Sequence, residues 1–346
     1  MKRFLCGLLL VSVLLSGCTA GQTEPEKKQY NASFLTLFDT VTTVVGKAEN
    51  EDAFRETSHA IHDELLQYHQ LFDIYNDYEG VNNLKTVNDN AGIAPVEVDS
   101  RIIALLKDCK SYYELTGGMV NPAMGSVLQL WHVARNDGIN DPANAYLPKQ
   151  EKLTEAAQHM NFDAVIIDEA ASTVYISDEN VQLDVGAVAK GWSVQRVAEH
   201  APSGLLISVG GNVCATGPKD ENGTAWVVGV QDPNGGDSYL HTLTVTKGSV
   251  VTSGDYQRAY VVDGKAYHHI IDPDTLMPAA YWRSVSIVCG DDFSDSGLAD
   301  ALSTALFLMD RESGEALVKE WGADAYWIAA DGSEYMTDGF EKMLRT

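Results

Sequence analysis

Residues 181–190 hold the first side chains whose chemistry stands out. Apolar and polar residues alternate over 181–185, which predicts a strand with Asp184 on its polar face near the end. Gly186 follows, and a helical pattern begins after Ala187 with Lys190 one turn in. Free backbone N–H groups at such a helix start can meet an anion, for example a pyrophosphate. A tight turn with a surface lysine is the alternative, because the segment has neither a Walker loop nor a Gly-x-Gly-x-x-Gly fingerprint.

A second group of oxygen ligands lies on a predicted helix nearer the C-terminus. Asp300 and Thr304 are four residues apart, just over one turn, so the carboxylate and the hydroxyl face the same point. Hard oxygen ligands of this kind suit Mg²⁺. The residues around them are almost all apolar, and a carboxylate in such surroundings needs a cation or a donor. The structural alternative is that Asp300 stabilises the first helical turn and Thr304 bonds a backbone carbonyl.

Adjacent histidines follow a hairpin signal at 263–264. His268 and His269 lie on an extended segment and point in opposite directions, so they cannot both bind one metal ion. One of them can act as a general base, although a single histidine is more often a hydrogen-bonded structural residue. Upstream, the hydroxyl- and glycine-rich turn at 252–258 makes Arg258 available for a phosphate or a carboxylate. Residues 210–212 and 121–125 are either close backbone approaches or simple turns.

Two amphipathic helices and a series of short strands must position these groups. Apolar residues at three- and four-residue spacing predict helices over 53–75 and from about Asp99 to a stop at Gly117-Gly118. Further helical patterns follow Ala187 and cover 297–309. The predicted strands are 164–167, 173–176, 181–185, 205–209, 226–230, 243–245, 259–262 and 284–288. Because strands and helices mix without a βαβ rhythm, the fold class is α+β, with a mixed or antiparallel sheet and packed helices in a single domain.

Composition excludes one large class of function. The chain has 346 residues, 45% of them hydrophobic, and 49 acidic against 24 basic residues, which gives a formal charge of −25. No basic field exists to attract a phosphate backbone, so we expect no nucleic-acid partner. Of the five cysteines, those at 6 and 18 belong to the N-terminal segment. The three at 109, 214 and 289 fit small core residues best, with one disulfide left open.

The N-terminal segment predicts export and a lipid anchor. Two basic residues precede an apolar run over 4–15, which is shorter than the roughly 20 residues that span a bilayer. The run ends in Ser16-Gly17-Cys18, which favours a lipoprotein cleavage site over a cleaved secretory signal or an anchor helix. We therefore predict a signal peptide over 1–17, a lipidated Cys18 that begins a flexible spacer over 18–30, and a folded domain over 31–346.

Together these segments resemble the FAD:protein FMN transferase family, the ApbE-like flavin transferases. The matching stretches are 184–191, 210–212, 252–258, 269–273 and Ala299-Asp300 with Thr304, and their order and spacing match as well. The likeness covers the chain from about Asn31 to its end. The family commonly has Asp-Pro-x-Thr-Gly after the histidine, whereas Leu276 stands at the glycine position here, so the turn must close without a glycine.

The resemblance implies a T-fold-like α+β fold and a Mg²⁺-dependent reaction. FAD is cut at its pyrophosphate, FMN is joined through phosphate to a Thr or Ser hydroxyl of an acceptor protein, and AMP leaves. By the family pattern, Mg²⁺ is bound by Asp300, Thr304 and the backbone carbonyl of Ala187, and His269 is the candidate base. The implied FAD contacts are Asp184, Lys190, the loop Ala123-Met124-Gly125, Tyr75 and Phe38, and we add Arg258 from the residues themselves.

The leading hypothesis is thus a flavin transferase tethered to a bacterial cell membrane and facing the extracytoplasmic side. Its partners are FAD and exported or membrane redox proteins. One alternative is an FAD pyrophosphatase that releases AMP and FMN, because water can replace the acceptor hydroxyl at the same metal site. Another alternative is a lipoprotein that binds FAD without chemistry, which the ligand pair Asp300 and Thr304 makes less favourable.

Overall fold

The computed structural model describes residues 27–236, 239–289 and 296–345. The predicted signal peptide and Cys18 lie outside these residues. The first strand, β1 (Lys28–Leu37), begins three residues before Asn31 and pairs with β2 (Thr40–Ala48) from Lys28 onward. The end of the predicted spacer therefore belongs to the folded domain. None of the helices in the described part of the chain combines the length and apolar character that crossing a membrane requires.

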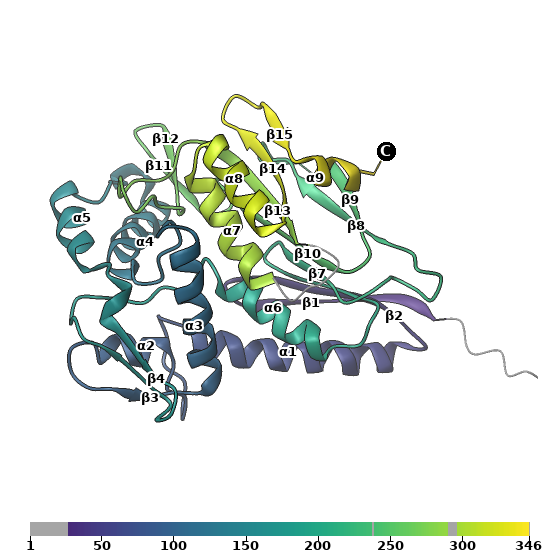
Figure 1. Ribbon diagram of the computed structural model, residues 1–346, viewed down its shortest axis with the longest axis horizontal. Helices are drawn as coiled ribbons and strands as arrows, with labels where there is room; N and C mark the ends of the chain where they lie inside the picture. Colours follow the sequence, from purple (N-terminus) through teal and green to yellow (C-terminus); the bar gives the residue numbers. More distant parts are fainter. Residues whose placement is uncertain (1–26, 237–238, 290–295, 346) are drawn as a thin grey trace, which may run out of the picture.

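An eight-stranded antiparallel sheet forms the centre of the molecule (Figure 1). Its strand order is β1-β2-β6-β7-β10-β13-β14-β15. The six further strands are β6 (Leu205–Val209), β7 (Asn212–Ala215), β10 (Gly248–Gly254), β13 (Trp282–Cys289), β14 (Asp324–Ala329) and β15 (Glu334–Met336). Every neighbouring pair is antiparallel, which agrees with the α+β class expected from the sequence.

Helices cover one face of this sheet and a hairpin covers the other. The helical layer consists of α1 (Glu51–Phe72), α6 (Ala189–His200), α7 (Ser296–Leu308) and α8 (Arg311–Trp321). The opposite face packs against β8 (Trp226–Gln231), β9 (Tyr239–Val245) and α9 (Asp338–Met343), with Trp226, Leu243 and Phe340 buried between them. The large sheet is therefore the middle of three layers, with one apolar core on each of its faces.

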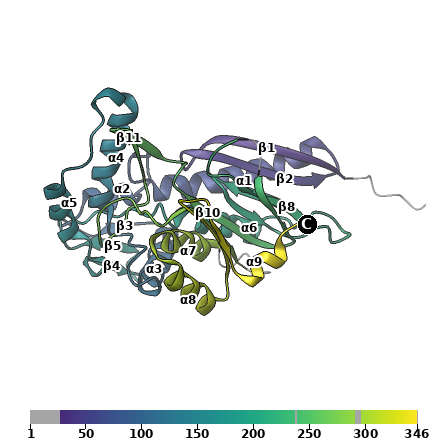
Figure 2. The ribbon, with the colours of Figure 1, turned by 90° about the horizontal axis from the view of Figure 1, so that it is seen from above.

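A smaller, mostly helical part extends from one end of the sheet (Figures 1 and 2). It contains α2 (Leu84–Asp89), α3 (Ser100–Leu115), α4 (Gly125–Asn140), α5 (Gln150–Ala156) and three 3₁₀ turns (Pro142–Asn144, Ala157–His159, Phe162–Ala164). Its strands are β3 (Val96–Glu97), β4 (Val165–Asp168) and β5 (Thr173–Ile176), which form one small sheet, and the hairpin β11 (Ala259–Val262) and β12 (Lys265–His268). The catalytic candidates lie where this part meets the large sheet.

The predicted helices are confirmed, and their ends follow capping rules. The side chain of Asn50 accepts a hydrogen bond from Ala53 N at 2.9 Å and begins α1, and Asp99 caps α3 in the same way. Gly117 and Gly118 both have positive φ after α3, as a helix stop requires. The three cysteines in the described part of the chain are buried, as predicted for small core residues, and no disulfide joins them to one another.

The prediction of a strand over 181–185 is wrong, because this segment does not pair along its length with a neighbouring strand. The segment is extended, but only Gln182 makes a ladder contact, a single parallel bridge to Met124. Leu183 instead bonds the side chain of Asn88, which accepts from Leu183 N at 2.7 Å and donates to Leu183 O at 3.0 Å. A side-chain amide thus replaces the neighbouring strand, because one amide offers both a donor and an acceptor. The alternation itself is confirmed, since Val181, Leu183 and Val185 are all buried.

Helices α6 and α7 approach closely at Gly191. A Cβ atom at this position would clash with the carbonyl oxygen of Ser296 and lie 2.6 Å from Cβ of Asp300. The absence of a side chain brings Gly191 N within 2.8 Å of Asp300 Oδ2, to which it donates a hydrogen bond. This contact between helices fixes the position of the Asp300 carboxylate.

We expect Gly191→Ala to destabilise the fold by about 1–3 kcal/mol, the usual cost of overpacking, and to reduce activity by displacing Asp300. Urea unfolding followed by circular dichroism measures the first effect. Gly314→Ala is the matched control, because Gly314 is also helical and its nearest neighbour is a flexible leucine side chain at 3.3 Å. Equal stabilities for the two variants would contradict the close helix contact.

Candidate active site

A cleft of about 1140 Å³ lies between the large sheet, α4, α6 and α7. It brings together most of the residues predicted from the sequence, although they come from segments far apart in the chain. The predicted residues that line it are Tyr75, Met124, Asp184, Ala187, Lys190, Arg258, His269, Asp300 and Thr304. The two glycines of the turn between β6 and β7, Gly210 and Gly211, line it as well.

Three predicted contact residues lie beside the cleft rather than on its wall. Ala123 is fully buried, and Gly125 N donates to Gln182 O at 2.9 Å. The ring of Phe38 packs edge-on against His69, with ring centroids 5.5 Å apart. The following residue of the β1–β2 turn, Asp39, does line the cleft. Phe38 therefore shapes the turn, and its carbonyl accepts a hydrogen bond from Arg258 at 3.4 Å.

The Asp300 carboxylate is the most buried acidic group of the cleft. Its side chain is only 4% exposed, and both of its close contacts involve Oδ2. Gly191 N donates to this oxygen at 2.8 Å, and the Lys190 ammonium lies 3.6 Å away. Lys190 also donates to Gly186 O at 3.2 Å. A buried carboxylate requires such partners, so Lys190 and Asp300 hold each other at the cleft wall.

The residues around Asp300 suit a hard cation. In the part of the chain that the structure describes, no three His, Cys, Asp or Glu side chains gather at one point. Instead, the same cleft is lined by Asp300 with its carboxylate, by Thr304 with its hydroxyl, and by Ala187. Thr304 Oγ1 lies 3.5 Å from Ser253 Oγ, which is too long for a strong bond and leaves the hydroxyl available. This oxygen-rich donor set fits Mg²⁺, which keeps positions for substrate oxygens.

Asp184 lies at the end of the extended segment that Asn88 holds. Its Oδ1 accepts a hydrogen bond from Gly186 N at 2.8 Å, and its own backbone N donates to Pro122 O at 2.8 Å. Burial raises the pKa of the Asp184 carboxyl, and the bond from Gly186 opposes that shift only in part. The desolvated carboxylate can accept hydrogen bonds from a substrate that enters the cleft.

The two histidines have different environments, as their opposite directions predicted. His268 Nε2 lies 2.8 Å from Ala279 O, and His268 Nδ1 accepts from Ile270 N, so this ring is structural. His269 lines the cleft and makes no hydrogen bond within the described residues, and its Nδ1 is buried. Nε2 is therefore the nitrogen that a substrate can reach. Burial, and next the positive charge of Arg258, lower the pKa of His269 to about 3, so the ring is neutral at neutral pH.

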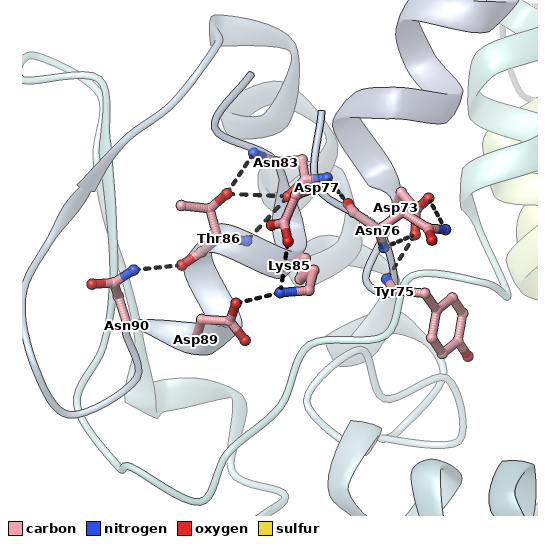
Figure 3. A network of polar contacts seen from close by, with 9 residues as sticks. All are labelled: Asp73, Tyr75, Asn76, Asp77, Asn83, Lys85, Thr86, Asp89 and Asn90. Atoms are coloured by element: carbon pink, nitrogen blue, oxygen red, sulfur yellow. Dashed lines mark hydrogen bonds and ion pairs between the residues drawn. The ribbon is translucent and has the colours of Figure 1, made fainter. Parts of the chain in front are cut away.

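The loop after α1 holds Tyr75 through a polar network (Figure 3). Asp73 Oδ1 accepts hydrogen bonds from Tyr75 N at 2.7 Å and from Asn76 N at 3.2 Å. The tyrosine ring projects away from this network and stacks on His132, with centroids 4.8 Å apart. Burial lowers the pKa of His132, and the neighbouring Arg135 lowers it further. The cleft thus has an aromatic wall suited to stacking against a flat ring.

Helix α4 carries the cleft residues that the sequence interpretation missed. His132 and Arg135 line the cleft from this helix, whereas the sequence interpretation placed only a loop over 121–125. The signal was present, because Val127, Trp131 and Ala134 recur at four- and three-residue spacing and are buried. Gly125 at the helix start and Gly138 near its end weaken that signal, since glycine disfavours helices.

The turn after His269 closes with Leu276 in a left-handed conformation, at φ 61°. Two features offset the strain, which costs about 1–2 kcal/mol for a residue other than glycine. The leucine side chain is buried in a cluster with Trp131, and Trp131 Nε1 donates to Leu276 O at 2.9 Å. The departure from the family motif is therefore accommodated locally by packing.

We expect Lys190→Ala to weaken FAD binding by about 1.5–3 kcal/mol, the range of a charge-assisted contact. The reason is that Lys190 lines the cleft beside a buried carboxylate and supplies positive charge for a bound phosphate. Isothermal titration with FAD measures the loss. Lys152→Ala is the control, because that lysine is exposed and pairs only with Glu155 in the smaller part of the molecule. Equal FAD affinity in both variants would contradict the role of Lys190.

Comparison with known proteins identifies the group to which this geometry belongs. The family model described as "ApbE family" matches residues 38–327. The FAD:protein FMN transferase of Treponema pallidum is 37% identical over 267 residues, covering 72% of this chain and 71% of that protein. An FAD:protein FMN transferase of Klebsiella pneumoniae is 30% identical over 271 residues, covering 75% of this chain and 80% of that protein.

Solved structures agree with the family match. The ApbE protein of Thermotoga maritima superposes with a TM-score of 0.79 at 30% identity, covering 92% of this chain and all of that one. The flavin transferase ApbE of Vibrio cholerae shares the fold, with a TM-score of 0.73 at 20% identity over 92% of this chain. The cleft, the order of the motifs along the chain and these similarities lead to one conclusion: the chain belongs to the ApbE family of flavin transferases.

Proposed function

We propose that this protein is a Mg²⁺-dependent FAD:protein FMN transferase. It cleaves the FAD pyrophosphate, joins FMN to a Thr or Ser hydroxyl of an acceptor redox protein, and releases AMP. The observation that carries the proposal is the cleft itself, in which the buried Asp300 carboxylate, the Lys190 ammonium and the accessible neutral ring of His269 face one space. Relatives of 30% identity or more bear the same activity in their names.

The proposed reaction is a phosphoryl transfer, and its bonds balance. The acceptor oxygen forms a bond to the FMN phosphorus, the bond from that phosphorus to the bridging oxygen of the pyrophosphate breaks, and AMP leaves with that oxygen. His269 Nε2 takes the hydroxyl proton as the attack proceeds, which its neutral state allows. Lys190 offsets the charge of the phosphate oxygens, because phosphoryl transfer depends on positioning and charge neutralisation.

Asp300, Thr304 and the Ala187 carbonyl would hold Mg²⁺ beside the pyrophosphate. A bound Mg²⁺ polarises phosphate oxygens and neutralises part of their charge. The chain's own contribution is to orient the ligands. Asp300 is fixed by Gly191 N, and Thr304 follows it by one turn of α7.

The residues proposed to contact FAD lie along the length of the cleft. Asp184 and the loop at Met124 lie near Lys190, and Tyr75 supplies the aromatic wall. Arg258 faces the same space and binds a backbone carbonyl rather than an acid. Ala123, Gly125 and Phe38 support these residues from behind, so in this proposal they contribute through the backbone shape of the cleft.

A labelling assay tests the proposal. The protein is incubated with FAD, Mg²⁺ and a flavin-acceptor domain, and the products are examined by in-gel flavin fluorescence and by chromatography of nucleotides. We expect a covalent fluorescent label on the acceptor that disappears with EDTA, together with AMP. Free FMN and AMP without a label on the acceptor would show that the protein is a pyrophosphatase instead. Bound but intact FAD would show that it is an FAD carrier.

We propose further that the protein is exported and tethered through a lipid on Cys18, facing the extracytoplasmic side of a bacterial membrane. The support is the sequence of the first 18 residues, which lie outside the described part of the chain. Fractionation of cells that carry the wild type or Cys18→Ala tests the tether. We expect the wild type to fractionate with the membrane and to carry lipid, and the variant to carry none. Identical fractionation and lipid content in the two proteins would contradict the lipid anchor.

A further inference from the structure

The cleft face of α4 leads from the cleft interior to its mouth. Six residues of this helix line the cleft: Leu128, Trp131, His132, Arg135, Asn136 and Ile139. The helix begins against the Asp184 segment, where Gly125 N donates to Gln182 O, and it becomes exposed toward Asn140. A rise of about 1.5 Å per residue places Arg135 about 15 Å along the helix from Gly125.

Arg135 lacks an acidic partner in a chain rich in acids. Its Nη2 donates to His132 Nδ1 at 2.9 Å, and no carboxylate of the described residues lies within the 4.0 Å ion-pair distance of its guanidinium. Elsewhere the described arginines at 55, 101, 196, 283 and 311 all pair with Asp or Glu. Burial lowers the pKa of Arg135 and the positive charge of Arg258 lowers it further, and the more distant charge of Asp184 opposes this shift only in part.

His132 orients this guanidinium without neutralising it. Because an arginine can only donate, His132 Nδ1 acts as the acceptor and carries no proton. The stacked ring of Tyr75 holds the imidazole from its other side. A fixed, half-buried guanidinium with no carboxylate at ion-pair distance is an anion-binding group, and its planar fork matches a carboxylate.

Arg135 is a third cation of the cleft, beside Lys190 and Arg258, the two side chains that the proposal assigns to the pyrophosphate. Lys190 has the Asp300 carboxylate within ion-pair distance, whereas Arg135 has no carboxylate of the described residues at that distance. Its guanidinium is therefore available to an anionic group that enters the cleft. The substrate that must enter through the mouth is the acceptor protein.

The surroundings of Arg135 are those of a protein-binding surface. Ile139 is 57% exposed at the end of α4, and Val41, 51% exposed, lies across the cleft at the start of β2. Apolar side chains around an arginine anchor are typical of protein interfaces. Resting on the proposed transfer activity, we propose that Arg135 is the docking residue for a carboxylate of the acceptor protein, close to the Thr or Ser that receives FMN.

Transfer kinetics with Arg135→Gln test this inference. The probe is a purified flavin-acceptor domain, and its concentration is varied at saturating FAD and Mg²⁺. We expect the KM for the acceptor to rise about 10- to 100-fold, the loss of one charge-assisted contact, with kcat and the FAD dissociation constant within about twofold of the wild type. Arg135→Lys keeps the charge without the fork and should give an intermediate KM.

Asp39 provides a control in which the expected change in the KM for the acceptor has the opposite sign. It lies on the cleft rim in the β1–β2 turn at φ 52°, a conformation that Asn adopts as readily as Asp. Asp39→Asn removes a negative charge that repels an incoming carboxylate, so it should lower the KM for the acceptor. Raising the salt concentration should increase the wild-type KM and change that of Arg135→Gln less.

A double-mutant cycle then locates the partner group. Each Asp or Glu near the target residue of the acceptor is changed to Asn or Gln, and we expect one of these changes to be non-additive with Arg135→Gln. Normal labelling with an unchanged KM in Arg135→Gln, or no coupled acidic residue, would overturn this inference alone. A tenfold loss of FAD affinity would assign Arg135 to FAD instead. Absence of labelling by the wild type would overturn the transfer activity, and this inference with it.

Discussion

Asp300→Ala is expected to reduce FMN transfer by at least about 10²–10³-fold while FAD binding survives in part. The variant removes the single carboxylate of the proposed Mg²⁺ ligand set, whose other members are neutral oxygens. Rates measured across a Mg²⁺ titration separate this effect from a folding defect. We expect the residual rate to be independent of Mg²⁺.

Asp300→Asn is the matched variant for that prediction. The amide oxygen still accepts the hydrogen bond from Gly191 N, so α6 and α7 stay in place, but the negative charge is lost. We expect Asn to preserve thermal stability and to lose transfer almost as fully as Ala. Wild-type rates in either variant, with an unchanged response to Mg²⁺, would exclude Asp300 from the metal site.

His269→Ala is expected to lower the transfer rate by about 10²–10⁴-fold, the usual contribution of a general base, with little change in FAD affinity. The ring lines the cleft, presents Nε2 and makes no hydrogen bond within the described residues, so its loss breaks no internal hydrogen bond there. Single-turnover transfer at saturating FAD measures the effect. A rate within about twofold of the wild type would assign the proton transfer to another group.

The low pKa of His269 adds an effect of pH on stability. The folded pKa of about 3 lies below the ordinary value of 6.5, so between these values the unfolded chain binds more protons than the folded one. Stability therefore increases with pH through this window and is lost as pH falls below about 6.5. At pH 5 the contribution is about 2 kcal/mol against the folded state. In matched urea titrations, we expect His269→Gln to be more stable than the wild type at pH 5. At pH 8 the titration of His269 should make no difference between the two proteins.

Local patterns predicted α1, α3, α6, α7 and about half of the strands, because burial on one side leaves a clear period in the sequence, but they missed α4 and the β1–β2 hairpin. The helix that begins at Asp99 and the strand over 173–176 were found at or within one residue of their observed bounds. The segment over 181–185 shows where this reasoning ends. Its alternation reports burial correctly, but the hydrogen-bond partner is the side chain of Asn88, almost a hundred residues earlier. No local pattern encodes that contact.

The site was predictable to the extent that motifs carried it. Asp300, Lys190 and His269 were found from spacing and from the family resemblance, and the structure brings them to one cleft. Arg135 was not, because it belongs to no motif and its significance depends on the tertiary arrangement. Only the folded chain shows that it lines the cleft and has no carboxylate of the described residues within ion-pair distance.

Intact-mass analysis of the acceptor tests whether this protein transfers FMN. The protein is incubated with FAD, Mg²⁺ and an acceptor domain, and the mass of the acceptor is compared with that of a variant in which the target Thr or Ser is replaced by Val or Ala. We expect the wild-type acceptor to gain the mass of one FMN less a water, one AMP to appear for each label, and the variant acceptor to gain nothing. An unmodified acceptor in the presence of hydrolysed or intact FAD would contradict it.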